Sequence, residues 1–548
     1  MNKVLKKVLI MVVSAFLLFY FMLPAINIHD AKFYYYIVIL LIEFAIINLP
    51  SDFARYRNGG FIYSIKSSLS SKVLKVTVII IAVSLAYVLI TDLIFTPFFM
   101  SKRFASRINV ETVEFSEIPP YNFNETALID RSSASNLGDK VMGEMIDLVS
   151  QFYVSEEYSQ ISYKEGTYRV TPLGYDGFIK YLKNKKDGIP GYIVVNTTTG
   201  ETKLNRIEKK MKYVPSAYFF EDFYRKLRFS HPFSIFGNPT FEIDEEGNPY
   251  YVCTVYAYNG IHALRRVKGV ILFDPCSGDS EYYNIEDVPT WVDRIYPEDL
   301  VIEELNDYGQ YRNGFLNSIF GQEGVIQTSR GYNYISKDGD IWLYSGMTSY
   351  GEDTSNIGFV LVDLRTHEAK YIATSGADEY SVMSSAEGEV LNYGYVATFP
   401  VLINLNNNPF YILSLKDSED LIKMYALVDA QDYQQVYTCK AEKDSKAVIE
   451  KLILSAVTNP NIELNNSYFE KINTTVWDIA DTIIDGNTYI YLNTDDGIFV
   501  CKVDSNNAES ILFIKEGDFV EIEYSKNGDA NIINSIKTIK NEVFMIIN

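Results

Sequence analysis

Chemically reactive side chains are scarce in this sequence, which has four histidines and four cysteines in 548 residues. The arrangements His-Glu-x-x-His, Gly-x-Ser-x-Gly and Cys-x-x-Cys do not occur in it. The motifs of zinc peptidases, α/β-hydrolases and thioredoxin-like oxidoreductases are therefore missing. Its Asp- and Asn-rich turns do not keep the alternating ligand spacing of a calcium loop. We predict no catalytic residue, no metal site and no cofactor.

The few cysteines leave two alternatives open. A chain of this length buries a large core without disulfides, and four cysteines permit three full pairings that a sequence alone does not resolve. Cys253 lies on an expected strand and Cys276 lies just beyond the next one. A cross-strand disulfide between these two is one alternative, and two free thiols are the other.

Positive charge is scarce after the first hundred residues. The chain has 49 Lys and Arg against 70 Asp and Glu, a net charge of −21. Residues 1–107 contain 12 basic and 4 acidic residues, so residues 108–548 contain 37 basic and 66 acidic ones. Nucleic-acid binding requires neutralisation of phosphates by basic groups. The acidic excess therefore predicts no nucleic-acid partner for the large C-terminal part.

Long apolar runs occupy residues of about 8–28, 33–49 and 76–98. The first is uncharged over 21 residues, enough helix to cross a hydrocarbon core of ~30 Å. It is too long for the apolar region of a signal peptide and lacks a small-residue cleavage site. We predict that residues 1–105 form a three-helix transmembrane anchor, with the lipid bilayer as its partner.

Lysine and arginine in the short loops predict the orientation of this anchor. Eight lie before the first run or between the second and third, and four lie on the opposite side of the spans. Positive charge is enriched in cytoplasmic loops. We predict a multi-pass protein of the cell membrane, with a cytoplasmic N-terminus and a large extracytoplasmic C-terminal domain.

Glu43 is an acid inside the second apolar run. Intramembrane acids are costly and often serve proton relay or pairing with a partner helix. The alternative is a protonated carboxyl that hydrogen-bonds Ser14 or Ser84 and holds the three helices together.

A strand–turn–strand phrase recurs four times after the apolar runs. In each copy an apolar strand ends in Asn or Asp, whose side chain can cap the following tight turn, and a second strand follows. Two copies also carry a glycine in the turn. The turn positions are Asn196 with Gly200, Asp274 with Gly278, Asp363, and Asp429. Helical stretches between the copies indicate an α+β fold of divergent repeated modules.

These phrases resemble the PepSY family of small extracytoplasmic modules, and the copy ending Thr199-Gly200-Glu201 is the most similar. The resemblance covers about residues 160–440. The stretch from Pro289 to Tyr334 is similar to full-length membrane-anchored envelope proteins of Gram-positive bacteria. In two later copies Thr366-His367 and Asp432-Tyr433 replace Thr-Gly. The resemblance implies a cell-envelope location and protein interaction or inhibition, and it supplies no catalytic residues.

We divide the chain after the anchor into modules at 106–235, 236–330 and 331–445, followed by a helix and a small OB-like or SH3-like β-barrel at 446–548. The hairpin signals Asp485-Gly486 and Asp496-Gly497 predict this barrel. The first hypothesis for function is a non-enzymatic scaffold, sensor or regulator that binds protein or wall polymer. The alternatives are an exported hydrolase of wall peptide or glycan, and a transport accessory subunit that uses Glu43.

Overall fold

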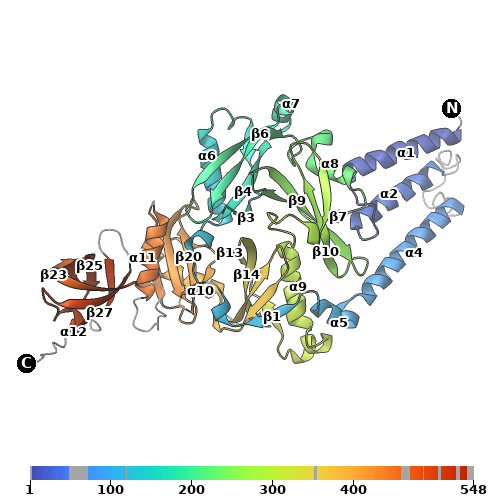
Figure 1. The fold of residues 1–548 in the computed structure, drawn as a ribbon. Coiled ribbons are helices and arrows are strands. Elements are labelled where there is room, and N and C mark those ends of the chain that lie inside the picture. The colour runs from blue at the N-terminus through green and yellow to red at the C-terminus, as the bar shows by residue number, and fades with distance from the viewer. Residues whose placement is uncertain are drawn as a thin grey trace, which may run out of the picture. The chain divides into compact units, whose positions relative to one another are not determined.

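The fold is known from a computed structural model (Figure 1). It describes residues 3–48, 72–118, 120–164, 166–350, 355–405, 407–442, 444–457, 470–484, 487–503, 508–525 and 531–539. The chain forms two compact units. The first comprises Met1–Ile403 and Pro409–Val448, and the second comprises Asn404–Asn408 and Ile449–Asn548.

Apolar helices begin the first unit: α1 (Lys3–Met22), α2 (Ala31–Ile47) and α4 (Lys72–Ile94). Two segments, Val4–Met22 and Lys75–Ile94, are long and apolar enough to cross a membrane. Their side chains face outwards, with 0% and 6% of the residues in those windows buried, as expected of lipid-facing helices. The 17-residue α2 is shorter. Three spans are therefore not shown, and Arg55, Arg57 and Lys66, on which the predicted orientation depends, lie outside the described residues.

Four sheets follow, and each has an antiparallel core of five strands built in the same way (Figure 1). A helix leads into a short edge strand, then a hairpin, then two further strands, and the second strand of each hairpin pairs with the edge strand. The first sheet has the order β2-β4-β5-β6, with β3 beside β4. Its elements are α6 (Arg131–Glu144), β2 (Phe152–Val154), β3 (Ser159–Tyr163), β4 (Gly166–Tyr175), α7 (Phe178–Asn184), β5 (Ile189–Asn196) and β6 (Thr202–Met211).

The second sheet repeats this order as β7-β9-β10-β11, with β8 beside β9. Its elements are α8 (Phe223–Ser230), β7 (Ile235–Phe236), β8 (Thr240–Ile243), β9 (Pro249–Tyr258), β10 (Arg265–Phe273) and β11 (Ser280–Asn284). The fourth sheet has the order β18-β20-β21-β22, with β19 beside β20. Its elements are α10 (Glu379–Glu389), β18 (Val396–Ala397), β19 (Val401–Leu405), β20 (Asn408–Lys416), β21 (Ile422–Asp429) and β22 (Val436–Lys440), and α11 (Ser445–Val457) comes next.

The third sheet has the core order β12-β14-β15-β16, with β13 beside β14 and two added strands. Strand β1 lies parallel to β16, and β17 pairs with β15. Its elements are β1 (Val110–Val113), α9 (Glu298–Tyr311), β12 (Ile326–Thr328), β13 (Asn333–Lys337), β14 (Asp340–Ser349), β15 (Ser355–Asp363), β16 (Ala369–Ile372) and β17 (Gly376–Ala377). Because β1 precedes all four sheets in sequence, its pairing ties the start of the large domain to the third sheet.

Local sequence explains where these units begin. Asp130, Asp222 and Asp378 cap α6, α8 and α10, each accepting a hydrogen bond from the backbone N–H three residues later. Such a cap satisfies one of the unpaired donors in the first helical turn. The long central strands are buried along most of their length, as β14 and β20 are, and supply the core of each sheet.

The repeated turn has the expected geometry. Asn196 Oδ1 accepts from the N–H groups of Thr198 and Thr199 at 3.0 and 2.9 Å. Asp274 Oδ1 accepts from Cys276 N at 2.7 Å. The side chain of each turn residue therefore caps its own turn, as the sequence predicted.

The later two copies of the turn keep this cap. Asp363 Oδ1 accepts from the backbone N–H groups of Arg365 and Thr366 at 2.7 and 3.1 Å. Asp429 Oδ1 accepts from those of Gln431 and Asp432 at 2.8 and 3.0 Å. Each of the four phrases lies between the third and fourth strands along the repeated path of its own sheet.

The described part of the second unit contains most of α11 and, after it, a short helix and five strands: β23 (Glu470–Ile484), β24 (Asn487–Thr494), β25 (Gly497–Lys502), α12 (Ala508–Ile511), β26 (Phe519–Ser525) and β27 (Asn531–Thr538). They form a closed circuit in the order β23-β24-β25-β27-β26. The circuit closes where β26 pairs with β23, and β25 and β27 run parallel. Val476, Leu492 and Phe499 are fully buried in its interior.

A candidate binding cleft in the first unit

A cleft of about 1480 Å³ opens between the sheets of the first unit. The N-terminal turn of α6, strand β4, the loop before β8, strand β9, the start of α9 and strand β13 all contribute to its lining. Sites of this kind, where several structural elements converge, are the usual places for ligands to bind. We call this space the central cleft.

Arg169 on β4 lines the central cleft and is 7% exposed. Its Nε donates to the carbonyl of Ile129 at 3.2 Å. Within the part of the chain that the structure describes, its guanidinium has no ion-pair partner. Burial lowers the pKa of Arg169 to about 10, which leaves the side chain charged at neutral pH. A buried charge without a counter-ion is costly, so this residue marks the site.

Arg294, just before α9, lies next to this position and is 8% exposed. It forms an ion pair with Glu298, and its guanidinium lies 4.8 Å from the ring centre of Tyr334. The Tyr334 hydroxyl donates to the same carboxylate. Burial would raise the pKa of Glu298, but the charge of Arg294 and the hydrogen bond from Tyr334 hold it below its ordinary value. Arg294 Nε is buried with no hydrogen-bond partner among the described residues.

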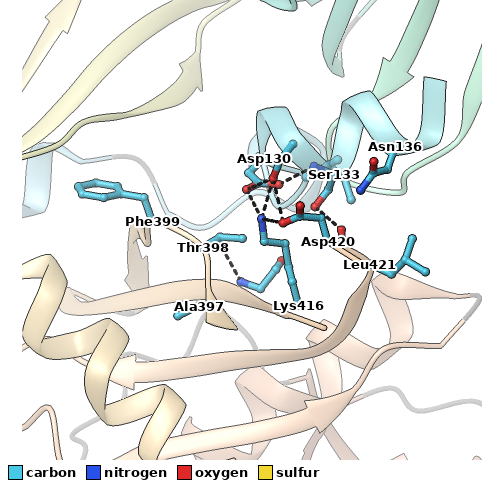
Figure 2. Close-up of polar contacts among 12 residues, drawn as sticks. Asp130, Ser133, Asn136, Ala397, Thr398, Phe399, Lys416, Asp420 and Leu421 are labelled. Atoms are coloured by element: carbon cyan, nitrogen blue, oxygen red, sulfur yellow. Dashed lines mark hydrogen bonds and ion pairs between the residues drawn. The ribbon is translucent and has the colours of Figure 1, made fainter. Parts of the chain in front are cut away.

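An ion-paired cluster holds α6 against the hairpin of β20 and β21 at the edge of the cleft (Figure 2). Lys416 Nζ lies 2.7 Å from Asp130 Oδ2 and 2.8 Å from Asp420 Oδ1. Ser133 Oγ donates to the Asp420 carbonyl at 3.1 Å, and Asn136 Nδ2 donates to the Glu419 carbonyl at 2.8 Å. Residues almost 290 positions apart are thereby joined, and the first and fourth sheets are fixed relative to each other.

The charges of this cluster are mutually stabilised. Burial raises the pKa of Asp130, but hydrogen bonds from Lys416 and Ser133 outweigh burial and lower it. For Lys416, burial lowers the pKa, but the hydrogen bonds to Asp130 and Asp420 outweigh it and raise it. Asp130 is therefore ionised at neutral pH and does not serve as a proton donor in the cleft.

Tyrosines form much of the remaining wall. Tyr158 and Tyr251 are buried and their hydroxyls have no hydrogen-bond partner among the described residues. Burial raises the pKa of both phenols, so each remains a neutral donor and acceptor. The tyrosines in the lining are Tyr153, Tyr158, Tyr224, Tyr251, Tyr256, Tyr258, Tyr332 and Tyr334.

Two fully buried acids lie behind the cleft wall and bind backbone. Glu242 accepts from Asp293 N at 2.9 Å, and Asp293 accepts from Ser162 N at 2.8 Å. Burial raises the pKa of both, and for Asp293 the neighbouring Glu242 charge raises it further. Neither side chain is part of the cleft lining. Their hydrogen bonds join β8 of the second sheet and β3 of the first sheet to the loop before α9.

Helix α9 extends from the cleft to helix α5 (Pro97–Ala105), which follows α4 in the chain. Arg107, which follows α5, bonds Glu303 at 2.6 Å and Asp307 at 2.5 Å, both on α9. At the cleft end of the same helix, Arg265 bonds Asp299 at 2.9 Å. Burial raises the pKa of Asp307 to about 6, although the hydrogen bond from Arg107 opposes this shift.

A second connection joins α8 to the end of α1 (Figure 1). Arg228 Nε donates to the Leu23 carbonyl at 3.1 Å, and Arg225 Nε donates to the Tyr20 carbonyl at 3.3 Å. The rings of Phe19 and Phe229 meet edge to face at 5.2 Å. These contacts satisfy carbonyls that a helix end leaves unpaired and fix the apolar helix to the second sheet.

The residues singled out from the sequence do not converge on the cleft. The turn residues Asn196, Gly200, Asp274, Gly278, Asp363 and Asp429 shape separate sheets. Cys253 and Cys276 are both free thiols, so the disulfide alternative is not formed. Within the described ranges, no cluster of three or more His, Cys, Asp or Glu residues is arranged to hold a metal ion.

Glu43 lies on α2, and its Oε2 is buried without a hydrogen-bond partner among the described residues. The expected hydrogen bond to Ser14 or Ser84 is therefore not made by this oxygen. Among the described residues, this oxygen therefore does not join α2 to another helix through a hydrogen bond.

Comparison with known proteins gives no family for the chain. No protein-family model and no curated protein matches it. Among solved structures, a chimera of ACO and RPE65 has a TM-score of 0.12 at 11% identity, covering 53% of this chain and 49% of that one. A levansucrase variant from B. megaterium has a TM-score of 0.15 at 9% identity, covering 79% of this chain and 92% of that one. The chain thus spans about half the length of the chimera, and neither likeness bears on the fold or the site.

The key cleft residues were not identified from the sequence. Arg169 stands within a strand whose other residues give no sign of a charged site, and its neighbours in space come from distant parts of the chain. Arg294, Glu298 and Tyr334 do lie within the stretch Pro289–Tyr334 that resembles envelope proteins. That resemblance was the available signal, but it did not indicate which side chains share a cavity.

Proposed function

We propose that this protein is a membrane-anchored component of the cell envelope whose large outer domain binds a protein or wall polymer in the central cleft, as a sensor, regulator or scaffold. The observation that carries this proposal is the cleft itself. It combines a volume of about 1480 Å³ with the buried Arg169, whose guanidinium has no ion-pair partner among the described residues, and with a wall rich in tyrosine. Unpaired polar groups in a cavity favour a ligand that completes their hydrogen bonds.

The proposal is non-enzymatic because the buried acids of the lining are held ionised. Glycoside hydrolysis needs one carboxyl with a raised pKa as proton donor. In the lining, the pKa values of Asp130 and Glu298 are both lowered. The alternative, an exported hydrolase acting on wall peptide or glycan, would therefore need its proton donor from another group.

We further propose that α1, α2 and α4 together form the three-span anchor, with the N-terminus in the cytoplasm. Exposed aromatic residues next to the helices support an interfacial position. Phe98 and Phe99 on α5 are 57% and 61% exposed, and Phe320 in the nearby segment Asn317–Gly321 is 81% exposed. The four sheets are proposed as PepSY-like modules and the closed five-stranded circuit as an OB-like barrel.

A sensing role is supported by the route from the cleft to the apolar helices. Helix α9 carries Glu298 in the cleft and Asp307 against Arg107 near α5. A ligand that moves the start of this helix would therefore act on the segment that follows α4. Transport assistance through Glu43 remains a weaker alternative, and Glu43→Gln with unchanged assembly and transport would remove it.

Photo-crosslinking in intact cells tests the proposed function. A photoreactive phenylalanine analogue replaces Tyr332, which lines the cleft and is 42% exposed. The control carries it at Tyr393, which is 59% exposed and lies outside the cleft lining. We expect one dominant envelope adduct from position 332 and none from 393. Identical adducts at both positions, or cytoplasmic partners alone, would contradict the proposal.

A further inference from the structure

We infer that the central cleft binds an acidic saccharide, with Arg169 holding its carboxylate or phosphate group. This inference rests on the proposed ligand-binding role of the cleft and names the chemical class of the ligand. Arg169 is the decisive residue because it is a buried guanidinium in the lining with no acidic partner among the described residues. An incoming oxyanion would supply the charge and the acceptors that the guanidinium lacks.

Several other donors surround the same position. Arg294 also lines the cleft, and its guanidinium is ion-paired with Glu298. Arg131, the first residue of α6, also lines the cleft, and its guanidinium donates to the Glu156 carbonyl at 2.8 and 3.0 Å. The positive end of the α6 dipole lies at the same side. With Arg265 they bring four guanidinium groups to a lining that also contains six carboxyl groups.

The rest of the cleft indicates a body larger than an inorganic anion. Its volume of about 1480 Å³ greatly exceeds that of a phosphate ion. Tyrosine side chains line the walls, and those of Tyr153, Tyr224 and Tyr332 are the exposed ones. Aromatic faces pack against apolar ring surfaces while their hydroxyls exchange hydrogen bonds. A sugar ring, which has apolar faces and many hydroxyls, matches both features.

Acids in the lining limit the charge of the ligand. Glu156, Glu157, Asp299 and Asp420 lie in the same wall, and like charges repel a polyanion. A ligand with a single oxyanion placed at Arg169 avoids this repulsion. The cleft therefore favours an acidic sugar unit over a densely charged chain such as nucleic acid.

Calorimetric titration of the full chain in detergent tests this inference. The probes are glucuronate and glucose 6-phosphate, with glucose and inorganic phosphate as their neutral and sugar-free counterparts. We expect at least one acidic sugar to bind at least tenfold more tightly than glucose and than inorganic phosphate. The Arg169→Met variant should lose the tenfold preference over glucose, and the surface control Arg206→Met, whose side chain is 51% exposed, should keep it.

Three results would overturn the inference: no acidic sugar preferred over glucose, an undiminished preference in Arg169→Met, or inorganic phosphate bound as tightly as the acidic sugars. If Arg169→Met does not fold, the salt dependence of the wild-type protein decides. The preference should fall as salt is raised from 20 to about 500 mM, because screening weakens charge attraction, and a salt-independent preference would contradict it. Capture of a partner at position 332 without any acidic-sugar preference would leave the proposed function standing and remove this inference.

Discussion

Four residues after three of the four turn residues, the backbone has a positive φ, and the side chain at that position affects stability. Gly200 and Gly278 have φ angles of +75° and +79°, and His367 occupies the same position in the third sheet with a φ of +67°. Left-handed backbone is costly for residues with a Cβ. The side chain of His367 makes two contacts at this position. Its Nε2 lies 2.8 Å from Glu304 on α9, and its ring stacks on Tyr296 with 4.1 Å between the ring centroids.

These turns give a matched stability test. In Gly200→Ala the new Cβ meets nothing nearer than 3.7 Å, so we expect a loss of about 1 kcal/mol from the backbone alone. In Gly278→Ala the Cβ would lie 2.6 Å from the Tyr213 ring, so the loss should be larger. Gly143→Ala in α6 meets nothing within 4 Å and should stabilise slightly. Unfolding of the full chain in detergent measures all three, and equal effects at 278 and 143 would refute the argument.

The ion pair of Lys416 and Asp130 gives a second test. The lowered pKa of Asp130 means that its contribution is present above its unfolded value of 3.8 and is lost as pH falls through the folded value. The raised pKa of Lys416 keeps its contribution below 10.5 and loses it above. Lys416→Met should therefore cost about 2 kcal/mol between pH 5 and 9. Lys423 lies 3.0 Å from Asp417 and its side chain is 40% exposed, against 8% for Lys416. The control Lys423→Met should therefore cost less than about 1 kcal/mol. Equal losses of unfolding free energy in the two variants would contradict the conclusion that burial strengthens the ion pair of Lys416.

Residues with local roles could be predicted from the sequence, and those with distant partners could not. The turn caps at Asn196 and Asp363 depend on neighbours within three residues, so a short pattern suffices to find them. Lys416 owes its importance to a partner 286 positions away, and Arg169 owes its importance to burial within a cleft whose lining comes from distant parts of the chain. No spacing rule in one sequence indicates such contacts.

At the scale of elements, helix α9 connects the cleft residue Glu298 with the segment that follows α4. Asp307, on the same helix, makes the stability of the protein depend on pH. Its folded pKa of about 6 lies above the ordinary 3.8. The folded protein therefore binds more protons than the unfolded one between these values, and stability from this group falls as pH rises through that window. In Asp307→Asn, the free energy of unfolding should fall less steeply between about pH 4 and 6 than in the parent protein. Unfolding at fixed pH steps measures this difference. An unchanged pH profile would show that Asp307 titrates normally.

The contact between α8 and α1 supports an element-scale prediction about dynamics. Arg228 donates to the carbonyls of Leu23 and Ser234, and the neighbouring Ile26 N–H donates to Pro232 at 2.7 Å. Arg228→Met removes the buried donor, so the Ile26 amide should exchange with deuterium at least tenfold faster. Arg206→Met, on the exposed face of β6, is the matched control. Unchanged exchange in Arg228→Met would show that aromatic packing alone holds the helix.

At the scale of the whole molecule, the sequence revealed the repetition better than the number of spans. Four phrases predicted a recurrent unit, and four sheets of one strand order are found. The repetition can be recognised in the sequence because each copy contains the same kind of local turn. The apolar runs predicted three spans, and two helices reach the needed length while α2 has 17 residues. Whether a short helix crosses depends on its packing and on the bilayer, which composition does not determine.

The central claim is that apolar helices anchor a ligand-binding body outside the cell. The most direct measurement uses Glu245→Cys, placed in an exposed turn between β8 and β9, and a membrane-impermeant maleimide added to intact cells. The parent protein reports background labelling of the four native thiols. We expect rapid additional labelling of the variant before the membrane is opened. Labelling that appears only after permeabilisation would contradict it.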